Sequence, residues 1–132
     1  MNTILVDPQH CFGHFRRVDA ARSVVDQMPG AWTGITHLFL DARADHCLSV
    51  DDIEVLLTLS PPIWVLAGQP TVEHPDTLWF HQRLAEAGKF LIEDLNTEGV
   101  DALPDQGEII AAPLKLSGLS GSPIRVLMRG AK

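Results

Sequence analysis

Two kinds of segment alternate along most of the chain. Short runs of β-branched and other apolar residues are typical of buried strands, and four such runs lie at 4–6, 36–40, 63–67 and 90–92. Other segments repeat apolar residues at the spacing of an amphipathic helix, and these lie at 18–28, 50–60 and 77–87. Strands that alternate with helices predict a largely parallel sheet whose crossover connections are right-handed.

Local signals mark the ends of the predicted helices. Ser49 followed by Asp52 resembles a capping box, and Pro61 stands where the second helix should stop. Asp76 is a suitable N-cap for the third helix. Gly88 follows that helix at a position where a left-handed residue is favoured. The run 63–67 is almost entirely apolar, which predicts a central strand with helices on both faces of the sheet.

The last part of the chain has a different pattern. Apolar segments at 108–112 and 124–128 are joined by a loop rich in Gly and Ser, with no helical segment between them. Two strands connected in this way predict an antiparallel pair. Together with the upstream pattern, this indicates one α/β domain over residues 1–132, with a mixed sheet and three helices.

Composition excludes several classes of function. The chain has 132 residues and a net charge of −7, with 45% hydrophobic and 20% charged residues, a balance typical of a globular domain. Nucleic-acid binding depends on clustered Lys and Arg, and no basic stripe is present. Arg16 and Arg17 are adjacent but isolated, so we interpret them as the solvated end of the first helix rather than as a nucleic-acid contact.

Cysteine usage and hydropathy indicate the compartment. Cys11 and Cys47 are the only cysteines, and they form neither a Cys-x-x-Cys pair nor a dense disulfide pattern, so we expect free thiols. No apolar run approaches the length of a membrane span, and the first residues lack the pattern of a signal peptide. We therefore expect a cytoplasmic protein whose partners are small molecules, with no nucleic acid and no membrane.

Ligands of open α/β sheets bind beyond the carboxyl ends of the strands. Polar residues that follow the predicted strands are therefore candidates, and they are Asp7, His10, Asp41, Arg43, Gln69, Glu73, Glu93 and Asn96. Asp7 and Asp41 are equally explained by turn hydrogen bonds.

Two histidine-containing segments were weighed as sites of chemistry. His10 and His14 have a spacing that would suit a metal on a helix, but the nearby Gly13 favours a loop, and no third ligand is fixed nearby in sequence. Cys47 follows His46, which could suggest an activated thiol, although an exposed loop before the second helix is the interpretation we prefer.

His81 and Glu93 are the more informative pair. His81 lies among apolar residues of the third predicted helix, and Glu93 ends an apolar strand. Both side chains are expected to point inward, into one pocket, and to lie within hydrogen-bonding or shared-ligand reach of each other. A core histidine with a hydrogen-bonded carboxylate would explain this pattern, and so would a pair of metal ligands or an acid/base with its orienting partner.

The C-terminal segment resembles the closing signature of the cyclase family of metal-dependent hydrolases, which includes kynurenine formamidase and isatin hydrolase. The resemblance is carried by Ala112-Pro113-Leu114-Lys115, by Gly118 and by Gly121-Ser122-Pro123-Ile124-Arg125. It extends upstream through Phe80-His81 and Phe90-Leu91-Ile92-Glu93-Asp94-Leu95-Asn96, and more weakly through Pro70-Thr71-Val72-Glu73.

The resemblance implies roles for individual residues. The family positions that match His81 and Glu93 are metal ligands, so these two are the candidate catalytic and metal-binding residues. Glu73, Asn96, Lys115 and Arg125 are the candidate substrate-binding residues. The resemblance also implies a swivelling β/β/α-like domain and hydrolysis of amide or lactam bonds by metal-activated water.

The chain departs from the family pattern at its N-terminus. Family members begin with a His-x-Gly-Thr-His-x-Asp segment that supplies further metal ligands, and this chain has no such segment. Gly68 also stands where the family has an aspartate. We therefore align the chain with the C-terminal part of the family fold and describe it as truncated at the N-terminus. No cofactor is expected, unless zinc or manganese binds at an incomplete site.

Three functional hypotheses follow. The protein could act without metal on a small cyclic or carbonyl-containing molecule, with His81 as acid/base and Glu93 orienting it. It could instead be a non-catalytic binding or assembly module. It could also be an amide hydrolase whose metal site is completed by another chain or by His10 and His14. Because a shortened fold leaves a sheet edge or face uncovered, we expect a homo-oligomer.

On the strand 124–128, we expect Ile124 and Val126 to face one way and Arg125 with Leu127 the other. If Arg125 points inward, it should pair with Glu93 or Glu73, because an unpaired buried charge is costly. If it is a surface residue, its loss should cost less than about 1 kcal/mol.

Overall fold

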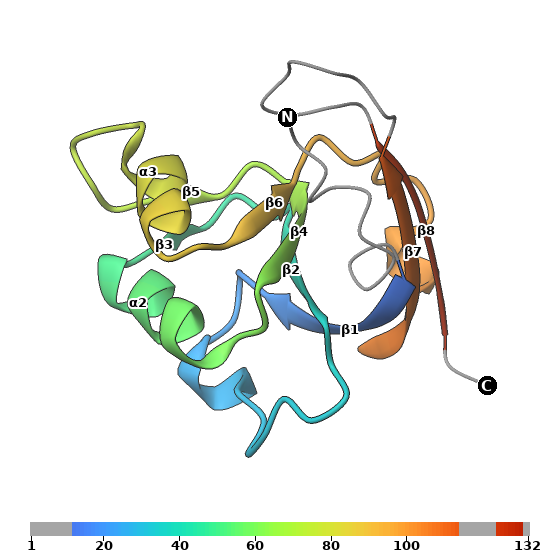
Figure 1. Ribbon diagram of the computed structural model, residues 1–132. Helices are drawn as coiled ribbons and strands as arrows, with labels where there is room; N and C mark the ends of the chain where they lie inside the picture. Colours follow the sequence, from blue (N-terminus) through green and yellow to red (C-terminus); the bar gives the residue numbers. More distant parts are fainter. Residues whose placement is uncertain (1–11, 114–123, 131–132) are drawn as a thin grey trace.

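A curled, six-stranded mixed sheet forms the centre of the computed structural model, which describes residues 12–113 and 124–130 (Figure 1). The strand order is β6-β4-β2-β1-β7-β8. Neighbours are parallel from β6 to β1, and β7 and β8 are antiparallel to their neighbours. The predicted parallel sheet closed by an antiparallel pair is confirmed.

The described elements have the following bounds. The sheet contains β1 (Phe12–Asp19), β2 (His37–Ala42), β4 (Ile63–Gly68), β6 (Phe90–Ile92), β7 (Gln106–Pro113) and β8 (Ile124–Gly130). A separate parallel pair is formed by β3 (Cys47–Leu48) and β5 (Thr71–Val72). The helices are α2 (Val50–Leu59) and α3 (Trp79–Glu86), with short 3-10 turns η2 (Val25–Gln27) and η3 (Val100–Ala102).

The first predicted helix is wrong. Residues 12–19 form β1, which pairs with β2 on one side and with β7 on the other, and η2 is the only helical turn in the rest of that segment. The apolar residues do recur at helical spacing, but pairing of Val18 and Asp19 with β2 at the start of the segment overrides that local pattern. The described residues therefore contain two α-helices instead of three.

The other predicted elements that fall within residues 12–113 and 124–130 are confirmed with small shifts. Ser49 accepts a hydrogen bond from the backbone of Asp52, whose side chain accepts one from Ser49, so the capping box is present. Asp76 is not the N-cap of α3, which begins two residues later than expected, but its side chain accepts the backbone N–H of Leu78 at 2.9 Å. Gly88 has a φ of 72° and ends α3 in the left-handed region.

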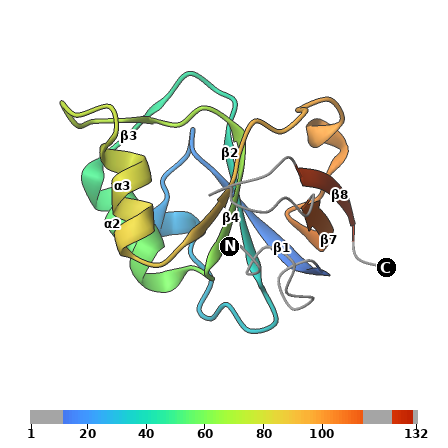
Figure 2. The same ribbon diagram turned by 45° about the horizontal axis from the view of Figure 1, so that its top comes forward.

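Each face of the sheet carries its own apolar cluster. On the helix side, Leu40 and Trp64 pack with residues of α2 and α3. On the concave side, Phe39 and Val65 pack with residues of η3, β7 and β8. Helices therefore cover one face only, contrary to our expectation, because the curl of β7 and β8 brings those strands over the other face (Figures 1 and 2).

Some predictions fall outside the described residues, namely the strand at 4–6, His10, Cys11 and Lys115. Cys47 is exposed and is a free cysteine, as expected. Among the described helices, none has both the length and the apolar character needed to cross a membrane.

Candidate functional site

The carboxyl ends of the four parallel strands meet at one edge of the sheet. Asp19 and Asp41 are register partners at the ends of β1 and β2. Gln69 follows β4 and donates a side-chain hydrogen bond of 3.0 Å to Asp94, which follows β6. The fold thus gathers at this edge most of the polar residues that the strand pattern predicts.

His81 and Glu93 are in contact across the gap between α3 and the end of β6. The distance from His81 Nε2 to Glu93 Oε2 is 3.0 Å, so the prediction that they lie within hydrogen-bonding distance is confirmed. Neither points into the core, however, because the side chains are 49% and 36% exposed. The apolar neighbours of His81 in sequence lie on the buried face of α3, where Phe80 and Leu84 pack against the sheet.

The exposure of this pair is itself informative. Since Nε2 of His81 contacts the carboxylate, the other ring nitrogen, Nδ1, is the one directed elsewhere. The ring of Phe80 meets the His81 ring edge to face, with centroids 5.5 Å apart. A histidine that is oriented by a carboxylate and open to solvent has the geometry of an acid/base group.

A cavity of about 450 Å³ adjoins Glu93 on the concave side. Glu93, Asp94, Asn96 and Glu98 supply its polar wall, while the opposite wall is apolar and comes mainly from β8 and the η3 region, with Val100, Leu103, Ile124, Val126, Leu127 and Met128. Among the described residues that line it, the ionisable groups are all carboxylates. The volume falls in the usual range for small-molecule sites, about 300–1,000 Å³.

The predicted substrate-binding residues are distributed unevenly around this cavity. Asn96 lines it and accepts the backbone N–H of Glu98 at 3.0 Å. Glu73 is exposed and follows β5, where its backbone donates to Leu48, and no described contact joins it to His81 or Glu93. Lys115 lies outside the described residues.

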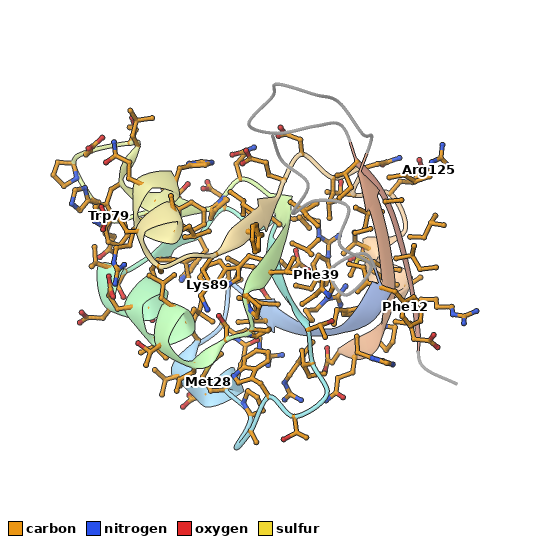
Figure 3. The ribbon with its side chains drawn as sticks, viewed as in Figure 1. Phe12, Met28, Phe39, Trp79, Lys89 and Arg125 are labelled. Atoms are coloured by element: carbon orange, nitrogen blue, oxygen red, sulfur yellow. The ribbon has the colours of Figure 1, made fainter. Side chains whose placement is uncertain are left out.

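Arg125 does not point inward. Along β8, Ile124, Val126 and Met128 pack against the concave cluster, so the alternate residues, including Arg125, face outward and are exposed (Figure 3). Among the described residues no carboxylate forms an ion pair with it. The predicted alternation of β8 is confirmed, and of the two cases for Arg125 the structure shows the surface one.

The metal prediction is limited by the number of donors. Within residues 12–113 and 124–130, no group of three or more His, Cys, Asp or Glu side chains is placed to hold a metal ion. His14 lies on β1 with its side chain exposed, rather than in the loop we expected. Catalytic zinc usually requires three protein ligands plus water, so the described residues alone do not fit a zinc or manganese centre.

A second group of charged side chains lies at the same edge, between β1 and β2. Asp41 accepts two hydrogen bonds from Arg43, at 2.8 and 2.9 Å, and Arg43 also pairs with Asp101 at 2.9 Å. The hydrogen bonds from Arg43 hold the pKa of Asp41 below its ordinary value, against the opposing effect of burial. Asp41 therefore does more than bond its own turn.

Arg16 and Arg17 belong to this group, and sequence reasoning missed them. Both are half-buried on β1, so their interpretation as a solvated helix end is wrong. Arg17 donates to the backbone oxygen of Val100 at 2.6 Å and stacks over Phe39, 5.2 Å from the ring centre. Two adjacent arginines in a strand at the centre of a sheet would have indicated a polar site, but the sequence pattern did not identify β1 as a strand.

Comparison with known proteins yields a match in structure only. No family model matches the chain, and no curated protein matches it. A solved structure described as a potential metal-dependent hydrolase with cyclase activity superposes with a TM-score of 0.66 at 20% sequence identity, covering 93% of this chain and 67% of that one. The chain therefore shares the fold of a cyclase-like hydrolase.

Proposed function

We propose that the protein binds and acts on a small cyclic or amide-containing molecule, with His81 as the acid/base and Glu93 as the residue that orients it. The observation that supports this most directly is the 3.0 Å contact between His81 Nε2 and Glu93 Oε2 beside a cavity that Glu93 lines. The shared fold with a potential metal-dependent hydrolase supports the class of reaction. A domain of swivelling β/β/α type is part of the same proposal.

The chemistry follows from the orientation of the ring. With Nε2–H donating to Glu93, the unprotonated Nδ1 of His81 accepts a proton from a water molecule. The water oxygen attacks the carbonyl carbon of the substrate, the C–N bond breaks, and the protonated Nδ1 returns its proton to the leaving nitrogen. Glu93 stabilises the imidazolium that exists between these two transfers.

The test measures turnover and metal dependence together. Protein purified without an affinity tag is assayed for metal content and for hydrolysis of an aryl formamide and of a cyclic lactam, with and without a chelator. We expect chelator-resistant turnover that falls by at least about 100-fold in His81→Ala, the usual contribution of general acid–base catalysis. His14→Ala, which removes an exposed histidine on β1, serves as the matched control.

The remaining outcomes separate the two alternatives. Stoichiometric metal, with turnover abolished by the chelator, would replace this proposal by a hydrolase whose metal site is completed by further ligands. Saturable binding of either compound without turnover would identify a binding module. Equal turnover in wild type and His81→Ala would refute the role of the histidine.

A further inference from the structure

A cleft of about 430 Å³ lies at the carboxyl ends of β1 and β2, apart from the cavity beside Glu93. We refer to it as the arginine cleft, and its charged lining residues are Arg16, Arg17, Asp19, Arg22, Asp26, Asp41, Arg43, Asp101 and Asp105. None of these residues lines the cavity beside Glu93. The two sites therefore differ in chemistry as well as in position. The lining of the arginine cleft is almost wholly polar, whereas the cavity beside Glu93 has an apolar wall.

The topology of the sheet explains why a hollow forms here. The chain leaves β1 through residues 20–28, whose buried members Ala20 and Val24 pack in the helix-side cluster. The connection into β7 passes the same strand end through η3, whose Val100 packs in the concave cluster. A crevice opens where two connections depart to opposite faces of a sheet, and such crevices beyond strand carboxyl ends are the usual ligand sites of open α/β sheets.

The inner wall of the arginine cleft holds one arginine, Arg16, that no described carboxylate neutralises. Its buried or half-buried charged residues are two cations, Arg16 and Arg17, and two anions, Asp19 and Asp41. Arg17 lies 3.9 Å from the Asp41 carboxylate, whereas no described carboxylate pairs with Arg16. The rim is exposed and mostly acidic, with Asp26, Asp101 and Asp105 against Arg22. An anionic group is therefore favoured beside Arg16 and disfavoured at the rim.

Two hydrogen-bond donors at the inner wall have no acceptor. The Nε atoms of Arg16 and Arg17 are both buried and lack a hydrogen-bond partner in the described structure. The terminal nitrogens of Arg17 are held by the backbone oxygens of Val100 and Leu103, and its Nε lies 3.9 Å from Asp41 Oδ2. The side chain of Arg16 makes no described hydrogen bond or ion pair. Buried donors in native proteins are nearly always bonded, so the Nε–H of Arg16 points to an acceptor that enters from the cleft.

We propose that the arginine cleft is a second binding site, for a small hydrophilic molecule that carries a carboxylate or phosphate group. The oxyanion lies against Arg16 at the inner wall, where the unpaired guanidinium supplies charge-assisted hydrogen bonds. The rest of the ligand lies toward the rim, where the exposed carboxylates of Asp26 and Asp105 accept hydrogen bonds from hydroxyl or amino groups. Apolar ligands are excluded, because almost no apolar surface lines the cleft.

The test is a titration with two bare anions, inorganic phosphate and succinate, which distinguish the two sources of the oxyanion. Binding is followed by calorimetry and by the NMR signals of the arginine Nε–H groups, at constant ionic strength maintained with chloride. We expect saturable binding of at least one anion in the millimolar range, with the Arg16 Nε–H signal shifting. Arg16→Gln should weaken binding at least about tenfold, as expected for loss of a charge-assisted hydrogen bond.

Arg125→Gln is the matched control, because it removes one exposed guanidinium from β8, outside the cleft. It should leave the affinity within about twofold of wild type, and so should His81→Ala, which keeps this test independent of the proposed reaction. If Arg16→Gln does not fold, the exposed Arg22→Gln replaces it, with a weakening of about threefold. The proposal would be overturned if neither anion bound saturably up to about 50 mM. It would also be overturned if Arg125→Gln weakened binding as much as Arg16→Gln does.

Discussion

Asp41 is the residue in which burial, charge and position are most closely linked. Its side chain is 10% exposed, yet it is ionised because Arg43 donates two hydrogen bonds to it. The same contacts raise the pKa of Arg43 further above its already high value. The ion pair at the end of β2 holds the side chains of Asp41 and Arg43 in fixed positions in the lining of the arginine cleft.

The pH dependence of stability should report this ion pair. Because the pKa of Asp41 is lowered by folding, its stabilisation is complete above the unfolded-state value of about 3.9 and is lost as the pH falls through the lower folded-state pKa. Asp41→Asn should therefore lower the free energy of unfolding by about 2 kcal/mol at pH 7 and by less at pH 3. Urea denaturation at both pH values tests this, with the exposed Asp45→Asn as control. A difference from wild type that grows toward acid would contradict it.

Gly68 and Gly88 separate backbone strain from steric exclusion. Both have positive φ values, 81° and 72°, but a Cβ on Gly68 would lie 2.6 Å from the backbone oxygen of Ala42, whereas nothing lies within 4 Å of one on Gly88. Gly88→Ala should cost about 1 kcal/mol from the left-handed conformation alone, and Gly68→Ala about 3 kcal/mol or more because β2 must also move. Equal shifts in denaturant midpoint would show that the contact with β2 is easily relieved.

At the scale of secondary structure, α2 shows how far local sequence determines an element. Its capping box, its apolar stripe and the prolines after it all agree with the observed helix. The same reasoning failed for residues 18–28, which satisfy a helical pattern locally. Val18 and Asp19 are held in β1 by pairing with β2, distant in sequence, and only η2 is helical in the rest of the segment. Such pairing is invisible to periodicity in a single sequence.

The helix cap gives a prediction at this scale. Ser49→Ala removes the acceptor for the backbone of Asp52 and should lower the free energy of unfolding by about 1 kcal/mol. Thr58→Ala, near the other end of α2, removes only a bond to the Glu54 carbonyl within the helix, and should change stability by no more than about 0.5 kcal/mol. Thermal or urea unfolding of the two variants compares them directly. A larger decrease in the free energy of unfolding for Thr58→Ala than for Ser49→Ala would contradict the stabilising role of the cap at the N-terminus of α2.

The two candidate sites were predictable to different degrees. The contact between His81 and Glu93 was expected from a family resemblance, since residues twelve apart on a helix and a following strand carry no geometric signal of their own. The arginine cleft was missed because its lining comes from β1, from residues 22–28, from the end of β2 and from residues 101–105. Only the fold brings those four segments together, and the misassigned β1 concealed the central one.

At the scale of the whole molecule, one sheet face carries an apolar row. Phe12, Ile110 and Leu127 are direct register partners across β1, β7 and β8, and all three are exposed, by 44% to 56%. A two-fold axis through Ile110 brings the row onto its own copy, so a second copy of this chain is the partner we expect. Light scattering should give a dimer at micromolar concentration, reduced to monomer by Ile110→Ser but not by Leu59→Ser on α2. A wild-type protein that scatters as a 14.5 kDa monomer would exclude the dimer.

The two apolar clusters should unfold together, because β2 and β4 contribute alternate residues to both. Leu40 and Trp64 face the helix side, whereas Phe39 and Val65 face the concave side. Loss of either cluster therefore exposes one face of β2 and β4 to water. The three tryptophans, Trp32, Trp64 and Trp79, all belong to or pack against the helix-side cluster. Tryptophan fluorescence therefore reports one cluster, and far-ultraviolet circular dichroism reports the whole sheet.

We expect the two signals to give coincident urea transitions in the wild type and in Phe39→Ala, whose cavity on the concave side should cost about 3–5 kcal/mol. The fluorescence midpoint should shift with that variant even though no tryptophan touches the concave cluster, because β2 and β4 transmit the loss. Leu40→Ala, the neighbouring residue on the opposite face, should cost about 2–5 kcal/mol and give the same coincidence. If fluorescence kept its wild-type midpoint in Phe39→Ala while circular dichroism shifted, the helix layer would be stable without the concave cluster, and the shared strands would not couple the two faces.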